Sequence, residues 1–302
     1  DPPRIDVEVH GLLQVRTGMI TREDAPPLGF ARLERARIMV NPVIGIFRGM
    51  LQLEIANGVS MIDARVDATL TPWLVVAAGQ GIVPYSRSWN TPVPVVATGD
   101  RSHPNNLFSP GRRVGAYAQL HGGPVTAWVG AYDATPPADL AGDVHAPLGI
   151  ARIQLSTSDA LPHTEIPSLR STDAGATVGA AFGAESAAGE PLLRATVDAA
   201  FHVGGFSAQA EAFTVAQPDV PARWGGSVQV GQFMVPQRFA VHGRLAAIGP
   251  DVVDENLRLV PEVAFTGYVY GSNAYLQLRA RMGAPGGAQD TTEVMLRGQL
   301  AF

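Results

Sequence analysis

The sequence predicts an all-β protein, a closed antiparallel transmembrane β-barrel of about sixteen strands in a single domain over residues 1–302. Three observations predict it. Apolar and polar residues alternate along most of the chain, the alternating runs are about 10 to 14 residues long, and short and long connections alternate between them. A period of two gives a strand one apolar and one polar face. A tilted strand needs about 9–11 residues to cross a bilayer.

The alternation recurs from the first run to the last. In 292–302, apolar residues or glycine occupy every second position up to Phe302, and polar residues such as Glu293 and Arg297 lie between them. No stretch repeats the spacing of an amphipathic helix over three turns. The predicted strands are 4–20, 29–42, 45–57, 59–71, 73–84, 112–122, 124–134, 147–157, 172–185, 192–203, 205–216, 223–235, 238–249, 257–270, 273–283 and 292–302.

The connections test this topology, because an up-and-down barrel with an even strand number has both termini on its short-turn side. Connections near residues 44, 72, 123, 204, 237 and 272 are tight, and the alternate ones, 21–28, 85–111, 135–146, 186–191, 217–222, 250–256 and 284–291, are longer. Two connections break the rule. Asn57-Gly58 is a short turn on the long-loop side, and 158–171 is a long connection on the short-turn side. Fourteen or eighteen strands therefore stay open.

Aromatic residues gather near the predicted strand ends, as in the interfacial girdles of transmembrane barrels. The short-turn side carries Phe47, Trp73, Phe201, Phe206, Phe233, Phe239, Tyr268, Tyr270, Tyr275 and Phe302, and the opposite side carries Phe30, Tyr85, Tyr132, Phe213 and Trp224. The alternative is a soluble sandwich or β-helix with the apolar face as its core. That core would need bulkier side chains than the Ala, Gly and Val of this face.

Composition excludes several functions. The formal net charge is −5, so nucleic acid is not expected as a partner. There is no Cys, which excludes thiol catalysis and Cys-ligated zinc, and all 22 basic residues are Arg. The chain opens at Asp1-Pro2-Pro3, which is typical of a mature form after removal of a signal peptide.

Segment 85–111 is the predicted constriction, because it exceeds the ordinary loop length of roughly 12–15 residues. Its apolar patch Val93-Pro94-Val95-Val96 and its polar stretch Asp100 to His103 suit a loop folded inside the lumen. The predicted constriction residues are Arg87, Asp100, Arg101, His103, Arg112 and Arg113.

The polar faces carry nearly equal numbers of arginines and carboxylates, so the position of these charges along the pore decides the selectivity. Selectivity is set at the narrowest point, where arginines favour anions. Several arginines cluster near mid-strand, which predicts a modest anion preference. The predicted pore-wall residues are Arg48, Arg65, Arg244, Arg279, Arg281, Arg297, Glu54 and Glu262.

No catalytic, metal or cofactor site is expected. The seven histidines are scattered, and H-E-x-x-H, P-loop and G-x-S-x-G motifs are missing from the sequence. Asp63 and Asp67 flank Arg65 on one face, which indicates an ion ladder rather than an acid–base pair. The acidic loop around Asp251 and Asp254, with Glu255 and Asn256, is a solvated charged loop or a loose divalent-cation site.

Several motifs resemble a known family. The terminal Phe302 resembles the C-terminal signature of bacterial outer-membrane barrels. Residues 78–86, AGQGIVPYS, resemble the G-Q-x-x-V-P-x-S segment of the phosphate-selective porins O and P, and 30–38 and 268–278 resemble that family's F-x-R-x-R-A-R-I strand and late aromatic hairpin. The resemblance implies a sixteen-stranded trimer whose third loop folds inward, in the outer membrane of a Gram-negative-type bacterium. The chain is short for the family and has no Lys, so its phosphate site is not carried over.

These observations together predict a porin that lets small hydrophilic solutes or ions diffuse passively and contacts membrane lipids, and the family resemblance implies a homotrimer. One alternative is a structural barrel that anchors a larger envelope assembly. The other is a barrel enzyme, which would need a Ser/His pair at the outer rim that the sequence does not show.

Overall fold

A computed structural model of the protein describes residues 5–22, 25–56, 58–133, 147–157, 164–166, 174–187, 190–249, 256–283 and 291–302. These residues form sixteen strands that close into one antiparallel barrel, in which β1 pairs with β16. The strands are β1 (Ile5–Arg22), β2 (Ala25–Ile44), β3 (Phe47–Glu54), β4 (Ser60–Thr71), β5 (Leu74–Ile82), β6 (Arg112–Gly122), β7 (Val125–Tyr132), β8 (Leu148–Ser156), β9 (Gly175–Ala187), β10 (Glu190–Val203), β11 (Phe206–Gln217), β12 (Val220–Val235), β13 (Phe239–Ile248), β14 (Arg258–Tyr270), β15 (Ala274–Met282) and β16 (Thr292–Ala301).

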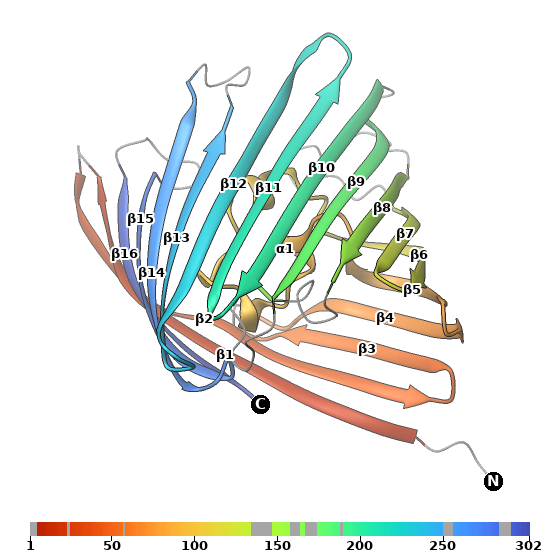
Figure 1. Ribbon diagram of the computed structural model, residues 1–302, viewed down its shortest axis with the longest axis horizontal. Coiled ribbons are helices and arrows are strands. Elements are labelled where there is room, and N and C mark those ends of the chain that lie inside the picture. Colours follow the sequence, from red (N-terminus) through yellow and green to blue (C-terminus); the bar gives the residue numbers. More distant parts are fainter. Residues whose placement is uncertain are drawn as a thin grey trace.

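The short helices α1 (Arg87–Asn90), η1 (Val93–Val95, a 3₁₀ turn) and α2 (His103–Phe108) all lie between β5 and β6. Figure 1 shows α1 within the ring of strands. No helix among the described residues is long and apolar enough to cross a bilayer.

The barrel wall is apolar outside and polar inside. On β16 the neighbours Leu296 and Arg297 are 45% and 1% exposed, and the same contrast repeats along most strands. A soluble sandwich would bury the apolar face instead, so this alternative is excluded. An outward apolar band around a closed barrel, in which every backbone group finds a partner on a neighbouring strand, is the architecture of a transmembrane β-barrel.

The pairing of β1 with β16 that closes the barrel extends to Phe302. Gly11 and Phe302 exchange two backbone hydrogen bonds of 2.7 and 3.0 Å, and the Phe302 ring lies against Gly11, where a Cβ would collide with it. Phe302 itself is 72% exposed. The alternation that placed Phe302 on the apolar outer face is confirmed.

Three of the expected long connections are shorter than predicted, because the flanking strands extend into them. β1 ends at Arg22 and β2 begins at Ala25, so the expected loop 21–28 is mostly strand, and 186–191 and 217–222 behave in the same way. The pairing continues past the end of the apolar alternation, because backbone hydrogen bonds do not need an apolar outer face beyond the bilayer. Most of 158–171 lies outside the described residues.

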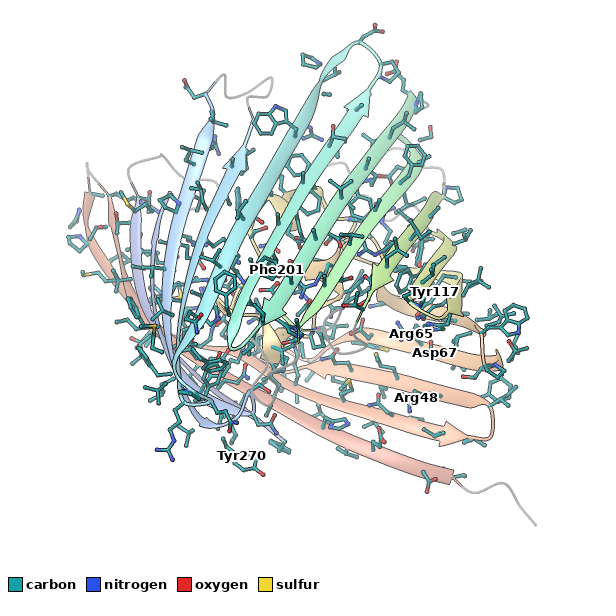
Figure 2. The ribbon with its side chains drawn as sticks, viewed as in Figure 1. Arg48, Arg65, Asp67, Tyr117, Phe201 and Tyr270 are labelled. Atoms are coloured by element: carbon teal, nitrogen blue, oxygen red, sulfur yellow. The ribbon has the colours of Figure 1, made fainter. Side chains whose placement is uncertain are left out.

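The aromatic residues are at the expected strand ends, but several face the lumen. Phe201 and Tyr270 are exposed near the short-turn end (Figure 2). The following residues are instead buried: Phe233, Tyr268 and Tyr275 in one interior cluster, and Tyr85, Tyr132 and Phe213 in another. Both clusters pack against segments that lie inside the barrel, so the girdle prediction is wrong for these six residues.

Candidate functional site

The segment between β5 and β6, residues 83–111, is seated inside the barrel and held from several sides. Its first set of contacts with the barrel wall is apolar. Tyr85 and Phe108 pack against Tyr132, Leu148 and Phe213 on the inner face of β7, β8 and β11, with Phe108 and Phe213 stacked at 6.2 Å between ring centroids. We call residues 83–111 the inner loop.

The second set of contacts is made with a buried carboxylate on β11. Glu211 accepts hydrogen bonds from the Ser88 amide at 2.7 Å and from the Asn105 side chain at 3.2 Å. The Arg87 guanidinium donates to Gln209 on the same strand. Ser86 and Ser102 cap α1 and α2 through their side chains, so these helices begin where the sequence provides capping hydroxyls.

The third set of contacts is an ionic cluster, which we call the Asp100 cluster. It consists of Asp100, Glu34 and the arginines 16, 35, 279 and 297. The Asp100 carboxylate lies 2.8 Å from Arg279, 2.8 Å from Arg297 and 3.0 Å from Arg16. Burial alone would raise the pKa of Asp100, but these guanidiniums outweigh it and hold that pKa well below its usual range. One loop carboxylate thereby joins β1, β15 and β16.

Gly99 makes this approach possible. Its φ is +78°, and a Cβ at this position would overlap the Arg297 guanidinium. Only glycine reaches such a conformation without strain and also lets the backbone pass this close to another group.

A fourth contact comes from the short-turn end, where residues 164–166 of the β8–β9 connection reach the underside of the inner loop. The Glu165 amide donates to the Val95 carbonyl at 3.1 Å, and the Glu165 carboxylate accepts from the Ala97 amide at 3.2 Å. Ile166 is buried with Phe233 and Tyr268. This long connection was the exception in the turn pattern, and it serves to support the inner loop.

The remaining space is a cavity of about 570 Å³ between the inner loop and the wall formed by β1–β8. Four arginines line it, and three of them pair with carboxylates: Arg37 with Glu54 at 2.7 Å, Arg65 with Asp67 at 2.7 Å and Arg112 with Asp63 at 2.9 Å. Figure 2 shows Arg65 and Asp67 together on β4, beside Tyr117.

The fourth arginine, Arg101, differs from the other three. It donates to the backbone carbonyls of Ser88, Trp89 and Thr91 at 2.8–2.9 Å and stacks on the Trp89 ring at 4.7 Å. No carboxylate among the described residues forms an ion pair with it. Burial, opposed by Glu165 and reinforced by Arg112 and other arginines, lowers the pKa of Arg101 to about 10, so it stays charged at neutral pH. It is the excess positive charge of the cavity.

The predicted constriction residues separate into three groups. Arg101 and Arg112 line the cavity. Asp100 and Arg87 hold the loop in place, and Arg113 pairs with Glu185 at 2.9 Å. His103 is the first residue of α2 and does not line the cavity.

The predicted wall residues separate in the same way. Arg65 lines the cavity and Glu54 holds Arg37 there, whereas Arg48 is exposed on β3. The others belong to ion pairs away from the cavity: Arg244 with Glu262, Arg279 and Arg297 with Asp100, and Arg281 with Glu293.

Sequence reasoning missed Arg35, Arg37, Glu34, Glu165 and Glu211. The segment Glu34-Arg35-Ala36-Arg37 was available as part of the F-x-R-x-R-A-R-I resemblance, but a register shift between β1 and β2 near Gln14 and Val15 breaks the alternation there. Of the possible acidic cation site, Asp251, Asp254 and Glu255 lie outside the described residues. Within the described residues no group of three His, Cys, Asp or Glu could hold a metal ion.

No protein-family model and no curated protein matches this chain by sequence. Solved structures match over nearly its whole length. An anion-selective porin from Comamonas acidovorans has a TM-score of 0.69 at 12% identity, covering 99% of this chain and all of its own. The outer membrane channel DcaP of Acinetobacter baumannii has a TM-score of 0.68 at 13% identity, with 99% and 97% coverage. The trimer form of OmpT, an outer membrane protein of Vibrio cholerae, has a TM-score of 0.65 at 10% identity and full coverage of both chains. At these identities the likeness shows a shared porin fold.

Proposed function

We propose that the protein is an outer-membrane porin through which small hydrophilic solutes diffuse passively, with a modest preference for anions. The observation that carries the proposal is the cavity beside the inner loop, in which Arg101 is the charge without a carboxylate partner. A positive charge at the narrowest part of a pore favours anions, and screening within about 8–10 Å confines its effect to that level.

The anion preference is therefore assigned to Arg101 of the inner loop and not to the mid-strand arginines that the sequence indicated. Arg279 and Arg297 are each 1% exposed and ion-paired with Asp100, so an ion in the cavity does not meet their charges directly. The paired arginines 37, 65 and 112 orient water and solute but add little net charge. The single charge of Arg101 therefore supports a modest preference and no dedicated phosphate site.

The test is the zero-current potential of the reconstituted protein across a KCl gradient in a planar bilayer. We expect chloride to permeate more readily than potassium, and Arg101→Gln to bring the permeability ratio toward one. Arg32→Gln is the matched control, because it removes the same charge from an exposed position of β2 outside the cavity. Clear cation selectivity that Arg101→Gln leaves unaltered would overturn the proposal.

The assembly belongs to the same proposal. The apolar outer face and the terminal Phe302 support insertion into the outer membrane of a Gram-negative-type bacterium, and the resemblance to trimeric porins supports a homotrimer. Mass measurement in detergent tests the trimer, which a purely monomeric protein would contradict. The anchoring and enzyme alternatives predict a co-purifying partner and a hydrolytic activity, respectively.

A further inference from the structure

The cavity that carries the anion preference also has an apolar lining, and this lining indicates what kind of anion it accepts. From the wall, Met39 on β2 and Met50 on β3 line it at inward positions where neighbouring residues such as Arg37 and Gln52 are polar. Leu12, Ile82 and Trp128 also line it. Apolar side chains in a narrow pore disfavour water and hydrated ions, so a path for inorganic ions alone has no use for them.

The inner loop contributes the rest of this lining through Pro92–Val95. All four backbone carbonyls of this segment and the Val95 amide have partners, with the Val93 carbonyl accepting from the Val96 amide at 3.2 Å. The Val95 amide bonds to the Pro92 carbonyl at 3.0 Å, the Pro94 carbonyl accepts from Gln299 at 3.2 Å, and the Val95 carbonyl accepts from Glu165 at 3.1 Å. Because neighbouring protein groups use these donors and acceptors, the segment presents mainly proline rings and valine methyls to the cavity.

The cationic group of the cavity is fixed in position. Nε and Nη2 of Arg101 are both engaged by backbone carbonyls, and its guanidinium stacks on Trp89. No hydrogen bond to Nη1 of Arg101 is formed by the described residues, and this atom is not sealed from solvent. The two N–H donors of Nη1 therefore remain for a solute.

We infer that the cavity selects monoanionic organic acids with an apolar body, holding the carboxylate at Arg101 and the body against Pro92–Val95, Met39 and Met50. This inference rests on the proposed porin function and names its solute class. A single negative charge matches the single unpaired guanidinium. A dianion would bring its second charge near Asp63, which also lines the cavity and is already paired with Arg112.

The experiment compares two six-carbon monoanions, hexanoate and gluconate, which differ in the polarity of the body. The full-length protein is reconstituted in a planar bilayer at pH 8, and reversal potentials are measured with potassium hexanoate or potassium gluconate against potassium chloride. Contact of about two methylenes with the apolar lining corresponds to a permeability ratio of roughly tenfold in favour of hexanoate. The double variant Met39→Gln/Met50→Gln should reduce this ratio severalfold.

Met282→Gln is the matched control, because it places the same change at the exposed end of β15, outside the cavity. Equal permeation of hexanoate and gluconate through the wild-type channel would overturn the inference, whether or not the double variant folds. A hexanoate preference that survives in a correctly folded double variant would also overturn it. Loss of chloride preference would contradict the proposed function instead, so the two failures are distinguishable.

Discussion

Replacing Asp100 by Asn should release the inner loop from one side of the barrel. The Asp100 carboxylate lies within 3.0 Å of Arg16, Arg279 and Arg297. Without it, these arginines would keep the carboxylates of Glu34, Glu262 and Glu293 nearby. Removing one partner from a buried ionic cluster costs about 3–5 kcal/mol. That cost changes the equilibrium constant between the loop held in the barrel and the released loop by roughly a hundredfold to a few thousandfold. The barrel itself should stay folded, since its strands pair without this group.

The assay is single-channel recording combined with the zero-current potential. Asp100→Asn should give a larger or strongly fluctuating conductance and a stronger anion preference, because one negative charge leaves the pore interior. The sign of the pH effect follows from the lowered pKa of Asp100. Its contribution is present above the carboxyl's ordinary pKa and is lost only as the pH falls through the depressed value, so the Asp100 contacts should hold the loop from neutral pH down to about pH 4.

Asp219→Asn is the control for this prediction, since it removes a carboxylate from an exposed turn between β11 and β12. Unchanged conductance and selectivity in a properly folded Asp100→Asn channel would refute the reasoning, because the cluster would then not hold the loop.

Other contacts lead to further predictions. Glu165→Ala should remove the support beneath the inner loop and increase current fluctuations without changing the temperature at which the barrel unfolds in a gel-shift assay. Arg152→Ala should lower that unfolding temperature, because it leaves Asp198, 2.6 Å away and fully buried, without its cation at a cost of about 3–5 kcal/mol; an unchanged temperature would contradict this. Deleting 90–101 should raise the conductance several-fold, and an unaltered value would show that the inner loop does not narrow the pore.

The strands could be predicted from the sequence because the physics that places them is local. Each residue's face follows from its parity in the strand, so Leu296 outside and Arg297 inside could be assigned without knowledge of any neighbour. Parity would also have placed Phe213 in the lumen, since it shares the face of Glu211 on β11. The girdle prediction failed there because it used only the position along the strand and not the face.

The site was only partly predictable because it is built from contacts between segments far apart in the sequence. Asp100 and Arg297 are both visible as charges, but the sequence does not indicate that they lie 2.8 Å apart as an ion pair. Arg101 is the next residue after Asp100, yet it turns to backbone carbonyls and keeps its charge for the cavity. A count of arginines on polar faces treats both environments alike. Under the proposed anion preference, the guanidinium that matters is the one left without a carboxylate in the cavity, and that depends on how the inner loop is folded.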